Sequence, residues 1–156
     1  MGEAVICRIA KKADAPTLIG FNVALAAETE DKKLDAAILS PGVERLFNLP
    51  QYGFYIVAEC DGSIAGSLLI TYEWSDWRNG LFWWIQSVYV APEFRRRGVY
   101  RALHSFAREL ASRDDDVRGL RLYVESENTG AHRAYEQLGM EETSYKFFEE
   151  VFARQM

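Results

Sequence analysis

The sequence predicts an α/β protein of the α+β type, with a mixed, mostly antiparallel central sheet flanked by helices. Two observations support this fold class. Residues 52–60 and 64–74 are apolar, β-branched and aromatic runs joined by Asp-Gly, which is the pattern of an antiparallel hairpin. A third apolar run, 81–90, is followed by an amphipathic helical pattern at 99–113. A strand that enters a helix in this way usually crosses over to a parallel neighbour.

The N-terminal third predicts one strand and then helices. Residues 4–10 read as the first strand. Asp14 is a candidate N-cap with Pro16 just inside the helix, so we expect a helix that runs to about Ala27. After a polar stretch, a second helical piece at 34–39 should break at the Pro-Gly pair that follows it. A further short helical turn is then expected at 43–49.

The C-terminal half alternates helices and strands. The helix at 99–113 has one apolar stripe, which should face the core. Its members are Val99, Ala102, Leu103, Phe106, Ala107, Leu110 and Ala111. His104 falls outside this stripe, and we expect only packing or surface roles for it and for His132. A strand at 120–125, a helix at 129–138 closed by Gly139, and a last strand at 145–152 complete the order.

Composition limits the classes of protein to consider. The 156 residues suit one domain, 1–156, with a real core. The net charge of −5 argues against non-specific nucleic-acid binding. No apolar run is long enough to span a bilayer and the N-terminal residues lack the pattern of a signal peptide, so we expect a cytoplasmic protein without a membrane partner. Cys7 and Cys60 lack the spacing of a metal site, and no metal is expected.

A basic run, Arg95 to Arg97, stands out in this acidic chain. It follows a buried strand and is closed by Gly98, directly before the amphipathic helix. Bare N–H groups at a helix N-terminus, next to arginines, are suited to a phosphate. A solvated loop is the alternative for the charge run alone. Its position at the end of a strand favours an anion site.

The segment VYVAPEFRRRGVYRAL, residues 88–103, resembles the acyl-CoA signature of the GNAT superfamily of N-acetyltransferases, and the order of elements is that of the GNAT fold. The resemblance implies that the turn holds the diphosphate of acetyl-CoA. The residues concerned are Arg95, Arg96, Arg97, Gly98, Val99, Tyr100 and Arg101. Tyr100 stands where the family has a small residue. Backbone groups of Val88, Tyr89 and Val90 would pair with pantetheine, and the amide near Val88 would polarise the thioester carbonyl.

A second stretch, NTGAHRAYEQLGM at 128–140, resembles the family's Asn…Ala…Tyr-Glu motif. The resemblance implies that Tyr135 is the general acid that assists the leaving thiolate, and that Asn128 and Ala131 contact the cofactor. The residues themselves allow plainer roles. Asn128 is also a good helix cap, and Tyr135 also fits a core aromatic position.

The general base is less defined. Many family members carry a glutamate in the strand before the arginine turn, but residues 81–90 contain no carboxylate. Glu73, Glu125 and Glu28 are candidates, as is a water molecule held by Gln86 and Ser87. Of these, Glu73 is taken as the candidate base. It lies beside Trp74 and Trp77, which would line an acceptor pocket for a cationic amine.

The predicted activity is acetyl-CoA-dependent N-acetyl transfer to a primary amine, by direct attack on the thioester. The acceptor is a small molecule such as a polyamine, amino sugar or amino acid, or a protein amine. A non-catalytic CoA-binding module of the same fold is the alternative. The C-terminus is short for the family, whose sheet usually ends in two strands, so a partner subunit is expected to supply the missing edge in a homodimer.

Overall fold

The computed structural model describes residues 4–153. The chain divides into two compact units, Met1–Tyr123 and Val124–Met156, and each is described by itself. The first unit contains the whole sheet and three of the four α-helices. The second contains the last helix and the C-terminal segment. That the chain functions as a single domain stays a prediction.

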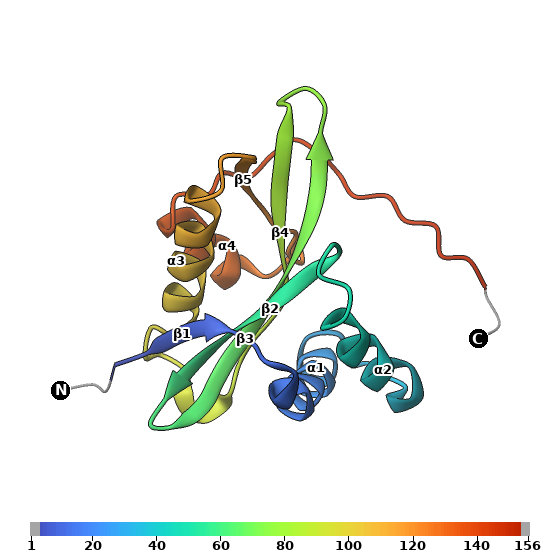
Figure 1. Ribbon diagram of the computed structural model, residues 1–156, viewed down its shortest axis with the longest axis vertical. Coiled ribbons are helices and arrows are strands. Elements are labelled where there is room, and N and C mark those ends of the chain that lie inside the picture. Colours follow the sequence, from blue (N-terminus) through green and yellow to red (C-terminus); the bar gives the residue numbers. More distant parts are fainter. Residues whose placement is uncertain (1–3, 154–156) are drawn as a thin grey trace. The chain divides into compact units, whose positions relative to one another are not determined.

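Five strands form the sheet in the order of the sequence (Figure 1). They are β1 (Ile6–Ile9), β2 (Gly53–Cys60), β3 (Ser63–Ser75), β4 (Gly80–Val90) and β5 (Val117–Arg121). The first three pairs are antiparallel and β4 pairs with β5 in parallel. The predicted mixed, mostly antiparallel sheet is therefore confirmed, including the crossover through a helix that a parallel pair requires.

The helices are α1 (Ala15–Glu30), α2 (Ala36–Leu46), α3 (Val99–Ser112) and α4 (Thr129–Gln137). Short 3-10 turns, Lys12–Asp14 and Pro92–Phe94, precede α1 and α3. Figure 1 shows α3 to one side of the sheet and α1 with α2 to the other. Because successive side chains of a strand point to opposite faces, each strand contributes to two cores.

The core under α3 contains Ile56, Ile70 and Ile85 from three strands, packed with Leu103 and Ala107. The predicted stripe of α3 therefore faces the sheet. The second core lies on the other face and is smaller. It joins the α1 and α2 residues to alternate positions of β2; its buried members are Ala15, Leu18, Val43, Tyr55 and Val57.

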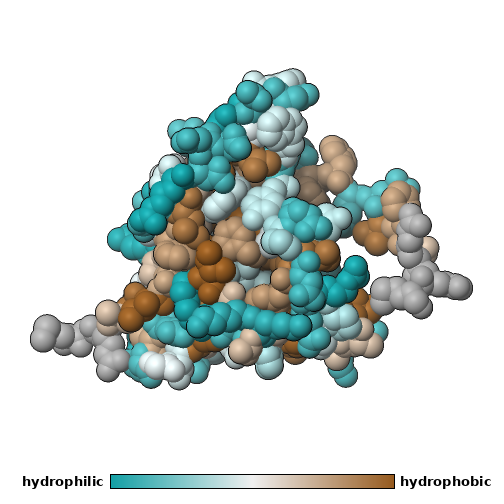
Figure 2. Space-filling view, in the orientation of Figure 1, coloured by the Kyte–Doolittle hydropathy of each residue, from teal (hydrophilic) through white to brown (hydrophobic). Residues whose placement is uncertain are grey.

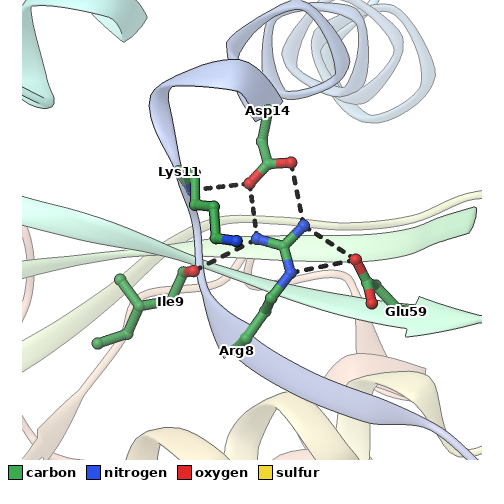
Figure 3. A network of polar contacts seen from close by, with 5 residues as sticks. All are labelled: Arg8, Ile9, Lys11, Asp14 and Glu59. Atoms are coloured by element: carbon green, nitrogen blue, oxygen red, sulfur yellow. Dashed lines mark hydrogen bonds and ion pairs between the residues drawn. The ribbon is translucent and has the colours of Figure 1, made fainter.

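A polar network ties β1 to the beginning of α1 (Figure 3). The Arg8 guanidinium donates to Asp14 at 2.7 Å and 3.1 Å, and to Glu59 of β2 at 2.9 Å and 3.1 Å. Asp14 also accepts from the backbone N–H of Lys11 at 2.7 Å. Arg8 therefore holds the pKa of the Asp14 carboxyl below its usual range. The predicted N-cap aspartate acts mainly through this ion pair.

The second helix differs from its prediction. The expected break at Pro41 and Gly42 is absent, and α2 runs through both residues. A proline inside a helix removes one backbone hydrogen bond. Here Val43 is buried, and Leu39 and Leu46 pack against the same core, so side-chain packing offsets that loss. The Asp35 side chain caps the helix by accepting from Ala37 N at 2.9 Å.

Two strand predictions were wrong. The fifth strand lies at Val117–Arg121 rather than 120–125, because it pairs only with the first half of β4. Residues 145–152 form no strand in the described chain. A strand needs a neighbour to complete its backbone hydrogen bonds, and the described sheet ends at β5. The expected homodimer stays a prediction.

His104 has a packing role, one of the two roles expected of it. It lies outside the apolar stripe but is fully buried. Its ring nitrogens lie 3.3 Å from the Tyr100 hydroxyl and 3.3 Å from Arg108 Nη2, one turn before and one turn after it in α3. Both polar atoms of the ring therefore have partners, which makes burial of an imidazole tolerable. Burial, together with the charge of Arg108, lowers the pKa of His104.

Candidate functional site

The parallel strands β4 and β5 separate halfway along β4. The ladder between β4 and β5 runs from the pair Leu81–Val117 to the pair Trp84–Arg121 and stops there. The second half of β4 continues to Val90 and pairs only with β3. On its β5 side, this half of β4 lies outside any ladder of the described sheet. Its backbone groups can therefore meet an extended ligand as an added strand would.

A β-bulge interrupts β4 in this second half. Ser67 pairs with Tyr89, but two residues further along β3, Leu69 pairs with Gln86, so β4 carries one extra residue. Ser87 adopts φ of 51°, a left-handed conformation that is uncommon for serine. Because of the extra residue, Gln86 and Tyr89 face the same side of the sheet although they are three positions apart. Bulges often redirect groups next to active sites.

The arginine-rich turn follows β4 directly. Arg96 and Gly98 have φ of 65° and 76°, and α3 begins at Val99. The first α-helical hydrogen bond runs from Ala102 N to the carbonyl oxygen of Gly98, at 3.0 Å. Gly98, the N-cap, has no side chain that could accept from the N–H groups at the beginning of α3. The turn therefore presents a helix N-terminus, with its partial positive charge, at the end of β4.

The four arginines of this region have different surroundings. Arg95 donates through Nε to the Val90 carbonyl at 3.0 Å and through Nη2 to Glu28 at 2.7 Å. Arg97 lies 3.5 Å from the carboxylate of Asp61. Arg96 and Arg101 have no ion pair with any described residue. These two guanidiniums are the ones not committed to a carboxylate of the chain.

Glu28 connects the last turn of α1 to the arginine turn. One carboxylate oxygen accepts from Arg95 and the other accepts from the Tyr89 hydroxyl at 3.0 Å. The Tyr89 ring also packs on Phe21, with centroids 5.1 Å apart. Arg95, and then Tyr89, hold the pKa of Glu28 below its usual range, and burial raises the pKa of Tyr89. Glu28 is therefore a poor proton acceptor.

The side chains of Val88 and Val90 pack against the core under α3. That of Tyr89 is buried on the opposite face, against α1. Only the backbone of this stretch can therefore meet a ligand along the open edge of β4. That these three residues bind a cofactor through their backbone groups stays a prediction.

Glu73, the candidate base, lies on the sheet face that α1 and α2 cover further along. Its Oε1 accepts from Trp84 Nε1 at 3.2 Å and from Arg121 Nη1 at 2.5 Å. Its side chain is 42% exposed. On the same face Gln86 Nε2 donates to Thr71 Oγ1 at 2.5 Å. This face therefore carries a polar group of side chains next to the point where β4 and β5 separate.

The acceptor pocket expected from Trp74 and Trp77 is not formed with Glu73. Trp74 pairs with Leu81 and Glu73 pairs with Phe82, so the two side chains point to opposite faces of the sheet. Trp77 lies in the turn between β3 and β4 and is 86% exposed. Figure 2 shows that this end of the hairpin is largely hydrophilic.

The second unit carries the other motif. The Asn128 side chain caps α4 by accepting from Ala131 N at 3.1 Å, so the cap role expected of it is confirmed. Tyr135 lies in the second half of α4 and is partly buried. His132 Nε2 lies 3.0 Å from the Glu125 carbonyl. Contact of Asn128, Ala131 and Tyr135 with a cofactor stays a prediction.

Two further findings concern the described residues as a whole. Among residues 4–153, no three His, Cys, Asp or Glu side chains gather in a way that could hold a metal ion. In the same part of the chain, no helix is long and apolar enough to cross a membrane.

Comparisons with known proteins agree with this geometry. The family model described as acetyltransferase (GNAT) family matches residues 23–140. A possible acetyltransferase from Clostridium difficile 630 is 41% identical, with a TM-score of 0.89 over 97% of this chain and 100% of that one. No curated protein matches the chain significantly.

Two more distant structures share the fold. Glucosamine-6-phosphate N-acetyltransferase from Arabidopsis thaliana is 19% identical, with a TM-score of 0.74 over 96% of this chain and 100% of that one. The aminoglycoside N-acetyltransferase AAC(6')-Iy, solved with CoA, is 18% identical, with a TM-score of 0.78 over 98% of both chains. At this level of identity the likeness concerns the fold alone.

Proposed function

The chain belongs to the acetyltransferase (GNAT) family, and on that premise we propose that it transfers the acetyl group of acetyl-CoA to the nitrogen of a primary amine. The observation that carries the proposal is the open edge of β4. It begins after Trp84, contains the bulge at Ser87, and leads into the arginine turn and the N-terminus of α3.

In the proposal, acetyl-CoA lies along this edge. The pantetheine pairs with backbone groups of Val88, Tyr89 and Val90, and its amides complete hydrogen bonds that the sheet leaves open. The diphosphate meets the N–H groups of residues 96–101. Arg96 and Arg101, which are uncommitted among the described residues, add charge-assisted bonds.

The reaction is a direct transfer. The amine nitrogen attacks the thioester carbonyl carbon, the C–N bond forms, and the C–S bond breaks with the electron pair on sulfur. A backbone N–H near Val88 stabilises the developing oxyanion. The phenol of Tyr135 donates its proton, or a hydrogen bond, to the leaving thiolate. The ammonium form of the acceptor must first lose a proton to a base.

We propose Glu73 as that base, acting through its second oxygen. Oε1 is engaged by Trp84 and Arg121, whereas Oε2 has no hydrogen-bond partner among the described side chains. Glu28 is a weaker candidate because both of its oxygens are engaged and its pKa is lowered. Water held by Gln86 and Ser87 remains the alternative route for the proton.

The test combines binding with turnover. Thermal shift with acetyl-CoA and CoA measures binding, and thiol release over a panel of primary amines measures transfer. We expect stabilisation by both nucleotides and amine-dependent thiol release. Tyr135→Phe should lower kcat by about a hundredfold or more while the CoA affinity is retained. Tyr52→Phe, at an exposed tyrosine before β2, is the matched control.

The outcomes separate the two functions that the sequence left open. Stabilisation by CoA without thiol release on any amine, peptides included, would favour a non-catalytic CoA-binding module. The feature that supports this alternative is the lack of a carboxylate in β4. If neither nucleotide stabilises the protein, the CoA site at the arginine turn is wrong.

A further inference from the structure

Arg121 is the last residue of β5, and its guanidinium lies over an aromatic ring. Its Cζ atom is 3.6 Å from the centroid of the Phe82 ring. Nη1 donates to Glu73, as described above. The side chain is 28% exposed, so it borders solvent while most of it is covered. Stacking and the ion pair together hold the guanidinium in one orientation.

The hydrogen-bonding capacity of Arg121 is only partly used. A guanidinium has five N–H donors in a rigid fork. Within the part of the chain that the structure describes, Nε and Nη2 of Arg121 have no acceptor. An arginine that serves only to hold a carboxylate commonly binds it with two parallel bonds. Here a single bond goes to Glu73, and the other donors remain available on a partly covered surface.

Arg121 also stands beside the proposed reaction site. Its strand partner is Trp84, the last residue of β4 before the strands separate. The bulge at Ser87 is three residues further along β4, which corresponds to roughly 10 Å of strand. The opening between β4 and β5 therefore has the arginine turn at one end and Arg121, Trp84 and Glu73 at the other.

The charges on this face fit a ligand that carries both signs. A second guanidinium, that of Arg78, also lies over the Phe82 ring, with its Cζ atom 5.1 Å from the ring centroid. Two cations thus surround Phe82 in a chain whose net charge is −5. The carboxylate of Glu73 pairs with Arg121, and Glu73 is the strand partner of Phe82. Guanidinium groups pair with carboxylate and phosphate in fixed geometry, whereas Glu73 suits an ammonium group.

We propose that Arg121 determines acceptor specificity by binding an anionic substituent of the amine. The substrate class is then small primary amines that carry a carboxylate or a phosphate, with the ammonium group at Glu73 and the anion at Nε and Nη2 of Arg121. This inference rests on the proposed acetyl transfer, because it names the acceptor of that reaction. It replaces the cationic polyamine as the preferred acceptor.

The experiment compares matched amines, of which one carries an anionic group and the other a neutral group at the same position. L-Alanine against L-alaninamide tests the carboxylate, and glucosamine 6-phosphate against glucosamine tests the phosphate. Thiol release gives kcat and KM for each amine. We expect the anionic member of at least one pair to have a kcat/KM about tenfold or more above that of its neutral partner. The pair that shows the preference identifies the anion.

Variants then assign the preference to Arg121. Arg121→Gln should lower the ratio of kcat/KM for the anionic amine to kcat/KM for its neutral partner about tenfold or more. Because Arg121 also donates to Glu73, any additional loss that both partners share reports on the base and not on the anion. Arg121→Lys should restore part of the preference, because it keeps the charge but loses the fork. Arg113→Gln, at the exposed arginine that follows α3, is the control and should leave this ratio unchanged. The melting temperature and CoA affinity of each variant show whether it is folded.

Failure of this inference differs from failure of the proposed function. If amines are acetylated but neutral partners are preferred, or if Arg121→Gln affects both members of a pair equally, the role of Arg121 is wrong and acetyl transfer stands. If no amine is acetylated, calorimetry on the CoA-bound protein decides. Binding of an anionic amine that Arg121→Gln abolishes supports the inference, and equal or absent binding of both partners overturns it.

Discussion

The carboxylate of Glu28, in the last turn of α1, accepts a hydrogen bond of 2.7 Å from the guanidinium of Arg95, in the turn that leads into α3. The two residues are far apart in the sequence and join the helix that covers one face of the sheet to the proposed diphosphate site. The carboxylate of Glu28 therefore forms an ion pair with an arginine that the family resemblance assigns to cofactor binding. An internal anion thus competes with the expected ligand for Arg95.

Removal of that competitor should therefore strengthen cofactor binding. We expect Glu28→Gln to lower the dissociation constant of CoA by up to about fivefold, because an exposed ion pair contributes only weakly. Isothermal titration calorimetry with CoA measures the change. Glu30→Gln, which removes a neighbouring exposed carboxylate of α1, is the control. Weaker CoA binding by Glu28→Gln would mean that Glu28 positions Arg95 for the diphosphate.

The bulge in β4 should be sensitive to the residue at its left-handed position. Ser87→Val places a β-branched side chain at φ of 51°, which costs about 1–2 kcal/mol. For a chain of this size that lowers the melting temperature by roughly 2–8 °C. Ser87→Gly should leave the melting temperature unchanged or raise it, because glycine accepts this conformation. Ser63→Val, at the exposed start of β3, is the control, and equal melting temperatures for both valine variants would argue against strain at Ser87.

The network around Arg8 should contribute stability above acidic pH (Figure 3). The side chain of Asp14 is 11% exposed, and Asp14→Asn weakens two charge-assisted bonds from Arg8. We expect a loss of about 2 kcal/mol. The melting temperature would then fall by roughly 4–8 °C. Asp31→Asn, at the exposed C-cap of α1, should have little effect.

The pH dependence of this contribution follows from the lowered pKa of Asp14. The unfolded carboxyl titrates near its usual value of 3.8 and the folded one titrates below it. The stabilisation is therefore complete above the unfolded pKa and is lost as pH falls through the folded pKa. The melting temperatures of wild type and Asp14→Asn should differ by a constant amount from about pH 8 down to about pH 5, which is roughly 1 unit above the unfolded pKa. The two melting temperatures should converge in stronger acid. A difference that is unchanged in acid would contradict the ion-pair account.

The folded state should favour the neutral form of buried His104, whereas it favours the charged form of Asp14. The pKa of His104 is lowered from 6.5 by burial and by Arg108, so the unfolded chain binds a proton more readily than the folded one. Stability is then lost as pH falls below 6.5 toward the lower folded pKa. The melting temperature of wild type relative to His104→Gln should decrease between about pH 7.5 and pH 5.5. The same comparison with His132→Gln controls for loss of a histidine, and parallel curves for His104→Gln would contradict the prediction.

Local patterns predicted most of the elements. Runs of apolar, β-branched and aromatic residues located β2, β3 and β4, and the 3.6-residue period located α3 with its buried stripe. Gly98 and Asn128 marked the beginnings of α3 and α4, because the conformation or side chain that begins a helix is a property of one residue and its near neighbours. The GNAT motifs lie on these same elements, so the family was recognisable from the sequence.

Long-range pairing decided the rest. The extent of β5, the bulge at Ser87, and the separation of β4 from β5 depend on register between strands that the sequence does not place side by side. The bond between Glu28 and Arg95 depends on how α1 lies on the sheet. The Arg121 position, stacked on Phe82 and next to Glu73, required three strands to align. Side-chain period and turn chemistry act over a few residues, whereas these contacts form only when the whole sheet is assembled.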